Sequence, residues 1–308
     1  MAQGDYTRIA VKPVAGALGA EIEGVNLAKL DDATFAEIKR AFLEHLVIFF
    51  RDQELTKHQL AGVAERFGPL TVIPYVKKLL TDHPFVTQLV READVPSSER
   101  NIGDNWHSDQ SPRERPSLGF ALYCLDAPEY GGDTMFANLY KAYDALSDGM
   151  KAMCERLTVM HSLSGKFGAD GYGHAGGFKA VPGADSKFDE ETLKLFRQET
   201  EHPLVRVHPE TGRKLLFVTG PYSIRFANMT VAESKPLLNY LNELVTRPEF
   251  TCRFRWRKGS LSIMDNRCTQ HYAVNDYEGF RRHMLRVEME GDRPFGPAMP
   301  HAPQAATA

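Results

Sequence analysis

Two residues near the middle of the sequence, His107 and Asp109, are of types that bind divalent metal ions. They stand two positions apart in NWHSDQS, and on an extended segment this spacing projects both side chains to one face. His271 follows far downstream in IMDNRCTQHYAV, just after a strand-like run and a turn signal. Two imidazoles and one carboxylate can hold Fe(II) and leave positions open for a cosubstrate and O2. On these residues alone, the alternative is a polar loop pair and a hydrogen-bonded structural histidine.

Two arginines on one predicted strand are of the type that binds an anion. Arg282 and Arg286 lie in RRHMLRVEM, and their even spacing places both guanidinium groups on the same strand face. If that face is buried, an anion must meet them, because an unpaired buried charge is costly. A planar guanidinium suits a bidentate grip on a carboxylate. If the face points to solvent, the two arginines form an ordinary surface pair.

A hydroxyl between these segments suggests a further contact to an anion. In PEYGGDT, Gly131 and Gly132 allow a tight turn, and Thr134 follows on a predicted strand. The Thr134 hydroxyl could bond an anionic cosubstrate whose other end chelates the metal. Plain strand propensity is the alternative explanation for a threonine at this position.

Short strand-like runs, separated by Gly, Pro and Asp turns, dominate the middle and end of the chain. Nearer the start, an amphipathic helix is expected from Asp32, a buried strand over 47–50 (VIFF), and a second helix after a capping box that begins at Thr56. No GxGxxG or GxxxxGK[ST] motif is present, which argues against a nucleotide-binding doubly wound sheet. We therefore expect a β-rich α+β protein, a sandwich or jelly roll with helical elaboration.

The bulk composition is that of an ordinary globular protein. The 308 residues carry a formal net charge of −3, which gives no broad reason to bind nucleic acid or an anionic membrane. The four cysteines are scattered, and no secretory signal or long apolar run is evident, so we expect a reduced, cytoplasmic protein. We expect a single domain over residues 1–296 and a disordered Pro/Ala-rich tail over 297–308.

Together these segments resemble the taurine dioxygenase/2,4-D dioxygenase family of Fe(II)/2-oxoglutarate-dependent oxygenases. The resemblance runs from about residue 8 to 296 through GAEIEGVNL, FFRDQ, RFGPL, NWHSD, YGGDT, HPETG, MDNRCTQHYA and RRHMLRVEMEGDRPF. It implies a double-stranded β-helix, a jelly roll, as the core. It implies the following roles: iron ligation by His107, Asp109 and His271, binding of the 2-oxoglutarate carboxylate by Thr134 and Arg282, and contact with the substrate's anionic group by Arg286.

The resemblance also bears on the substrate. Taurine dioxygenase holds its sulfonate with a His and a Tyr after the FG-x-L turn, and has an Asn four residues before the first iron ligand. Here these positions are Ile73, Val76 and Gly103, so taurine is not expected as the substrate. The apolar wall and Arg286 suit a larger, partly hydrophobic anion.

Several segments around the site look most similar to the branch that cleaves (R)-2-phenoxypropionate herbicides, notably VREADVPSSERNIGDNWHSD and MHSLSGKFG. An aryloxyalkanoate-like carboxylate is the expected substrate. Lys77 or Lys78 could add a positive contact or be an exposed loop lysine, and Tyr222 could line the pocket or be structural. The glycine-rich residues 164–190 are expected to form an active-site lid.

The implied activity is hydroxylation of a C–H bond in a small organic anion, with Fe(II) as cofactor and 2-oxoglutarate and O2 as cosubstrates. Succinate and CO2 are released, and the hydroxylated product can break down when the new hydroxyl shares its carbon with a heteroatom. One alternative is an alkyl sulfate or alkanesulfonate dioxygenase. Another is a non-catalytic jelly roll that binds 2-oxoglutarate or metal. A homo-oligomer, dimer or tetramer, is expected.

Overall fold

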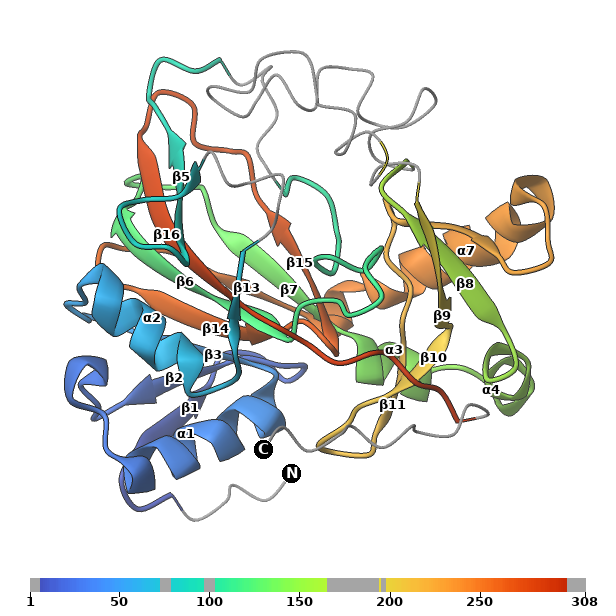
Figure 1. The fold of residues 1–308 in the computed structure, drawn as a ribbon, viewed down its shortest axis with the longest axis horizontal. Helices are drawn as coiled ribbons and strands as arrows, with labels where there is room; N and C mark the ends of the chain where they lie inside the picture. Colours follow the sequence, from blue (N-terminus) through green and yellow to red (C-terminus); the bar gives the residue numbers. More distant parts are fainter. Residues whose placement is uncertain (1–5, 73–78, 97–102, 165–193, 195–197, 298–308) are drawn as a thin grey trace.

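The computed structural model describes residues 6–72, 79–96, 103–164, 194 and 198–297 (Figure 1). Its largest element is a sheet that combines strands from both ends of the chain, in the order β1-β2-β3-β14-β6-β16-β4, with β5 also paired to β16. The pairing of β2 with β3 is parallel, and the other pairings in this sheet are antiparallel. The strands are β1 (Ala10–Pro13), β2 (Ala20–Glu23), β3 (Val47–Phe50), β4 (Leu70–Thr71), β5 (Val86–Arg91), β6 (Gly119–Asp126), β14 (Leu261–Asp265) and β16 (Arg282–Met289).

Smaller antiparallel sheets complete the β structure, in the orders β13-β7-β15, β12-β8-β9 and β10-β11. Strands β8, β10, β11 and β13 coincide with the strand-like runs LTVMHSL, LVRVHP, KLLFVT and FTCRFRWR. The strands are β7 (Thr134–Asn138), β8 (Thr158–Ser162), β9 (Glu199–Pro203), β10 (Val205–Val207), β11 (Lys214–Leu216), β12 (Ser223–Phe226), β13 (Thr251–Phe254) and β15 (Thr269–Ala273).

Two helices near the N-terminus cover the outer face of the large sheet (Figure 1). Helix α1 (Asp32–His45) begins after Asp31, whose side chain accepts a hydrogen bond from the Thr34 amide. Helix α2 (Lys57–Glu65) begins with the predicted capping box, in which Thr56 and Gln59 satisfy each other's backbone amides. Both helix predictions are confirmed.

Strand β3 shows how the core is divided. Its four residues are all fully buried. Ile48 and Phe50 pack against the helices, whereas Phe49 points inward and stacks on Phe254 of β13 at 3.9 Å between ring centroids. Phe49 also contacts Phe136 of β7 at 5.6 Å. The inner face of the large sheet therefore packs on the β13-β7-β15 sheet, and an unbroken apolar run is required because both faces of β3 are covered.

Of the remaining helices, α3 (Leu139–Asp144) packs against β11 and α7 (Val231–Val245) packs against β12. Helix α7 was not among the predicted elements, although Thr230 and Glu233 form a capping box at its start. Pro236 lies inside this helix, and a proline within a run of residues argues against predicting a helix there. None of the helices in the described part of the chain is long and apolar enough to cross a membrane. These elements are α3 (Leu139–Asp144), α4 (Asp148–Cys154), α7 (Val231–Val245), and the 3-10 turns η1 (Leu27–Lys29) and η4 (Pro248–Phe250).

Candidate active site

The three predicted metal ligands come together in the structure. One side-chain donor atom from each of His107, Asp109 and His271 lies within 4.8 Å of the others, and all three residues are buried. His107 Nε2 is 3.4 Å from Asp109 Oδ1, and His271 Nε2 is 3.7 Å from Asp109 Oδ2. The two imidazole rings lie 4.2 Å apart between centroids. The candidate metal site is therefore a compact cluster.

Backbone pairing holds the two histidines together. His107 and His271 form an isolated antiparallel bridge, with N–H···O distances of 3.1 and 2.9 Å in the two directions. His271 lies in β15, whereas Asp109 lies in the loop that follows the bridge. This one backbone rung holds together two predicted ligands that are distant in the sequence.

The cluster fits a divalent transition metal. His107 Nδ1 lies 2.6 Å from the Asn105 carbonyl, so that nitrogen carries the proton and leaves Nε2 as the electron-pair donor. Donors in adjacent positions of an octahedral ion lie about 3 Å apart when each is about 2.1 Å from the metal. The 3.4 and 3.7 Å separations of Asp109 from the imidazoles require only a small contraction to reach that spacing.

Arg286 is paired with Asp109, the carboxylate of the candidate metal cluster. Its Nη2 donates to Asp109 Oδ2 at 2.7 Å, and its guanidinium carbon lies 4.5 Å from the centre of the Phe120 ring. Burial alone would raise the pKa of Asp109, but the charges of Arg286 and the two histidines outweigh burial and hold this pKa well below its usual range. Asp109 is therefore ionised, as a metal ligand must be.

Glu288 is a further acidic residue on the same strand face, and the sequence analysis did not select it. It is 5% exposed, and Arg286 Nη2 lies 3.3 Å from its Oε2. Ser117 donates its hydroxyl to Glu288 Oε1. Burial raises the pKa of Glu288 to about 7, since the lowering by Arg286 is partly cancelled by the charge of Asp109.

The predicted 2-oxoglutarate residues both lie close to Trp256. Thr134 begins β7 and Arg282 begins β16, and both are buried. Trp256 links them, because its Nε1–H donates to Thr134 Oγ1 at 2.9 Å and its ring lies 5.9 Å from the Arg282 guanidinium. Since Trp256 supplies the donor, the Thr134 hydroxyl is left to donate its own proton to an acceptor.

Arg282 is a buried cation at the start of β16. Its Nε donates to the Gly132 carbonyl at 3.2 Å, and within the described ranges it forms no ion pair with a carboxylate. Burial removes water from around the Arg282 guanidinium, and this loss of solvation lowers its pKa from the usual value. The adjacent turn requires glycine: a Cβ on Gly131 (φ +74°) would lie 2.3 Å from the Asp276 carbonyl oxygen. A buried guanidinium beside a hydroxyl that can donate is chemically suited to binding a carboxylate.

Of the predicted substrate residues, Gly103 and Tyr222 lie beside the first metal ligand. Gly103 has φ +88°, and a Cβ there would lie 3.3 Å from His107 Cε1. The buried Tyr222 ring is 6.3 Å from the His107 ring. The other predicted contacts, Ile73, Val76 and either Lys77 or Lys78, lie outside the described residues, as does the predicted lid beyond Ser164.

Asn266 supports the site and was also missed. Its side chain accepts from the Asp109 amide at 2.6 Å and donates to the carbonyls of Asp109 and Ser117 at 2.9 and 3.0 Å. It stands in the MDNR stretch that carried the family resemblance, but no spacing rule linked it to Asp109. The residue fixes the backbone of the loop that bears the carboxylate ligand.

A second cluster of ligand-type residues is a hydrogen-bonded network. His208, Asp265 and Cys268 lie close together, but Arg267 binds both Asp265 oxygens at 2.8 and 2.7 Å. His208 Nδ1 accepts from two backbone amides, so its Nε2 carries the proton and donates to Asp265 at 3.0 Å. Burial raises the pKa of the Cys268 thiol well above its usual range. This network leaves no donor set ready for a metal.

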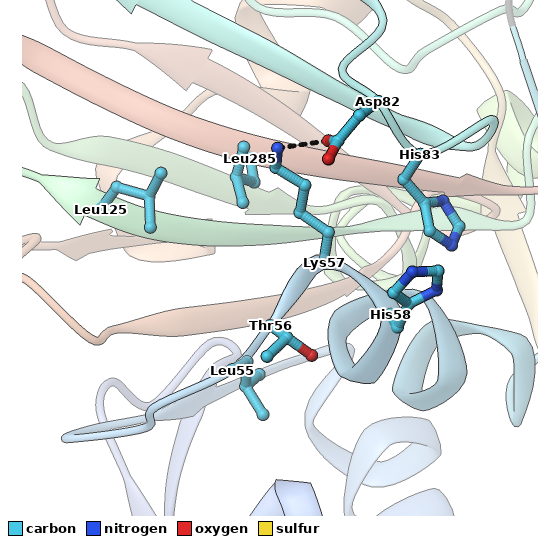
Figure 2. A pocket seen from close by; sticks show the side chains of 8 residues that line it. All are labelled: Leu55, Thr56, Lys57, His58, Asp82, His83, Leu125 and Leu285. Atoms are coloured by element: carbon cyan, nitrogen blue, oxygen red, sulfur yellow. Dashed lines mark hydrogen bonds and ion pairs between the residues drawn. The ribbon is translucent and has the colours of Figure 1, made fainter.

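A surface pocket of about 390 Å³ lies on the opposite side of β16 (Figure 2). It is lined by Leu285, which packs with the helix-facing core, and by the start of α2. Figure 2 shows the Lys57 ammonium paired with Asp82, at 2.5 Å, and His83 beside His58. The charges in this pocket are already matched, and it does not open onto the inner face that carries Arg282 and Arg286.

Comparisons with known proteins agree with the geometry. The model of the taurine catabolism dioxygenase TauD, TfdA family matches residues 10–287. An alpha-ketoglutarate-dependent sulfate ester dioxygenase of Pseudomonas putida is 36% identical, over 93% of this chain and 91% of its own length. An (S)-phenoxypropionate/alpha-ketoglutarate-dioxygenase of Sphingobium herbicidovorans is 31% identical, over 94% and 98%. A crystal structure of a taurine dioxygenase from Burkholderia xenovorans superposes with a TM-score of 0.77 at 34% identity, covering 96% of this chain and 95% of that one. The chain belongs to the TauD, TfdA family and is a 2-oxoglutarate-dependent non-haem iron dioxygenase.

Proposed function

We propose that this enzyme hydroxylates a C–H bond of a small organic anion and that the anion is a sulfate ester. The observation that carries the proposal is that the metal cluster and the pair Thr134 and Arg282 lie on the same inner face. His271 lies directly opposite Phe136, and Thr134 is two residues before Phe136 on β7. Diagonal neighbours of this kind lie about 7–8 Å apart, a span that a five-carbon dicarboxylate can bridge.

Each residue then has one task. His107, Asp109 and His271 would hold Fe(II), which when bound supplies the activation of O2 and the oxidation of the substrate, with conversion of 2-oxoglutarate to succinate and CO2. Arg282 and Thr134 hold the far carboxylate of 2-oxoglutarate. Arg286 receives the anionic group of the substrate and so decides which C–H bond faces the metal.

The relatives guide the choice of substrate class. The sulfate ester dioxygenase is more similar to this chain than the phenoxypropionate enzyme, which reverses the order expected from the sequence motifs. Hydroxylation of the carbon that bears the sulfate oxygen gives a hemiacetal-like ester. Its C–O bond then breaks, yielding an aldehyde and inorganic sulfate. An aryloxyalkanoate carboxylate is the second candidate, supported by the phenoxypropionate relative.

The architecture is proposed to be a double-stranded β-helix, in a single domain over residues 1–296. Support comes from the antiparallel strands, the packing of the large sheet on β13-β7-β15, and the similarity to the taurine dioxygenase structure. In this arrangement the metal ligands and arginines lie between the sheets.

A coupled substrate screen tests the function. The protein is titrated with Fe(II) and 2-oxoglutarate without O2, and the visible absorption of the chelate is followed. Air-saturated buffer is then added with an alkyl sulfate, an aryloxyalkanoate or an alkanesulfonate. Succinate formed in equal amounts with inorganic sulfate supports the proposal, and succinate formed with a phenol supports the second candidate. Succinate at the substrate-free level with all three classes contradicts both.

A further inference from the structure

Strand β16 places an acidic side chain beside Arg286, the residue proposed to bind the substrate's anionic group. Glu288 lies two residues after Arg286, and it pairs with Phe120 of β6 across the sheet. Directly opposed residues share a face. The Phe120 ring contacts both His271 and Arg286, so this face is the one that lines the metal cluster. Glu288 therefore points into the site, although no step of the proposed reaction uses it.

One guanidinium nitrogen serves two carboxylates. Arg286 Nη2 lies 2.7 Å from Asp109 Oδ2 and 3.3 Å from Glu288 Oε2. One guanidinium and two carboxylates carry a formal net charge of −1. When Asp109 and the near carboxylate of 2-oxoglutarate together neutralise a divalent cation, the ion pair of Arg286 with Glu288 remains and is neutral. An incoming anion thus meets an arginine whose charge is already offset.

Ser117 keeps Glu288 in this position. Its hydroxyl donates to Oε1, so the carboxylate cannot swing away without losing a buried hydrogen bond. With Glu288 5% exposed, little water screens its charge from a ligand on Arg286.

We propose that Glu288 is a specificity-determining residue. Its charge makes the site at Arg286 bind monoanions, such as sulfate monoesters, in preference to dianions of the same shape, such as phosphate monoesters. The inference rests on the proposed function, in which Arg286 receives the substrate's anion. A sulfate monoester brings one negative charge, whereas a phosphate monoester brings about two, since its second pKa is about 6. The second charge is repelled by Glu288, and Arg282, the other arginine on this face, is taken up by the far carboxylate of 2-oxoglutarate in the proposed function. Repulsion of the wrong ligand is a general route to specificity.

The test compares hexyl sulfate with hexyl phosphate. Binding to the enzyme loaded with Fe(II) and 2-oxoglutarate is measured by calorimetry without O2, at about pH 8, where the phosphate is a dianion. Glu288→Gln removes the charge and keeps an acceptor for Ser117. The matched control is Glu290→Gln, which makes the same change at an exposed position just after β16.

The wild type is expected to bind hexyl sulfate at least about tenfold more tightly than hexyl phosphate, and Glu288→Gln should narrow that ratio by about tenfold. Glu290→Gln should leave the ratio unchanged. An unchanged ratio in Glu288→Gln overturns the inference but not the proposed function. Failure of the wild type to bind either ester overturns the proposed substrate class and the inference with it. Glu288→Met, also uncharged and of similar length, is read in the same way if Glu288→Gln does not fold.

Discussion

Asn266 and Asp109 are joined by two reciprocal hydrogen bonds, one from the Asp109 amide at 2.6 Å and one to its carbonyl at 2.9 Å. Asn266 also binds the Ser117 carbonyl, and it is 1% exposed. A single amide side chain therefore holds both ends of the loop from Asp109 to Ser117.

Replacing Asn266 by Ala should weaken metal binding about 10–100-fold, because groups that orient a ligand contribute at this level. Stability should also fall by about 1–3 kcal/mol for each buried group left unsatisfied. Fe(II) affinity is measured by anaerobic calorimetry. Asn239→Ala, on the exposed face of α7, is the control and should match the wild type. Wild-type metal affinity in Asn266→Ala would contradict the positioning role.

Replacing His271 by Ala should abolish coupled turnover and weaken Fe(II) binding by about a hundredfold or more, because one of the three ligands is lost. Iron content after anaerobic loading and desalting provides the measurement. His58→Ala alters a histidine at the pocket on the other side of β16 and should retain full loading. A His271→Ala protein that still couples substrate oxidation to succinate would show that the ligand set is wrong.

Replacing Arg282 by Met should raise the 2-oxoglutarate concentration needed for half-maximal activity about a hundredfold, because charge-assisted hydrogen bonds contribute about 1.5–3 kcal/mol each. The same change should leave the ligand-free protein as stable as the wild type or more so, because it removes a buried cation that has no carboxylate among the described residues. Steady-state kinetics and thermal unfolding are measured together. An unchanged 2-oxoglutarate requirement would refute the role.

Trp256 and Thr134 should act as one unit on 2-oxoglutarate. If the indole N–H orients the Thr134 hydroxyl, Trp256→Phe should raise the cosubstrate requirement about tenfold, as one hydrogen bond to a charged group would. Thr134→Val should have a similar effect, and the double variant should be little worse than either single one. Fully additive losses would mean that the two residues act separately.

His202 should make the protein less stable in mild acid. Burial lowers its pKa to about 4, although contacts with the Ser111 and Arg113 carbonyls partly oppose this. The folded state therefore holds a neutral ring, while the unfolded chain takes up a proton below about pH 6.5. The stabilisation that comes from the neutral ring is fully present above about pH 6.5 and is lost as the pH falls towards about 4. At about pH 5 this group should have lowered the free energy of unfolding by about 2 kcal/mol.

Urea unfolding at about pH 7.5 and pH 5 measures this loss. His202→Gln retains a donor for the two carbonyls and cannot titrate, so its unfolding free energy should fall less between the two conditions. Parallel losses in the two proteins would assign the acid sensitivity to other groups, among them His161, which is also buried with a lowered pKa.

Local periodicity predicted the parts of the site that depend on strand geometry. The shared face of Arg282 and Arg286 follows from alternation along β16, and the turn before Thr134 follows from two glycines whose φ angles are both positive. The contacts that complete the site join residues far apart in the chain. Trp256 with Thr134 and Asn266 with Asp109 depend on how sheets pack, which no local pattern encodes.

Side-chain partners were harder still to anticipate. The sequence indicated that Arg286 meets an anion but not that its nitrogen already contacts both Asp109 and Glu288. Glu288 lies two positions after Arg286, so the same alternation places it on the arginine face, but its type alone did not indicate a buried role. The motifs near the site resemble the phenoxypropionate branch. Over the whole chain, however, sequence identity is higher to the sulfate ester relative than to the phenoxypropionate relative.

The single backbone rung between His107 and His271 also bears on folding. These residues belong to distant segments, and the rung is a single bridge between His271 in β15 and His107, which lies outside the regular strands. A cation held by both imidazoles would cross-link the chain at that point and stabilise only the folded state. At a free metal concentration about a hundred times its dissociation constant, this linkage adds about 2.7 kcal/mol. Preparations that lose iron should therefore unfold at lower temperature, so that the melting point of a stored sample reports its metal content.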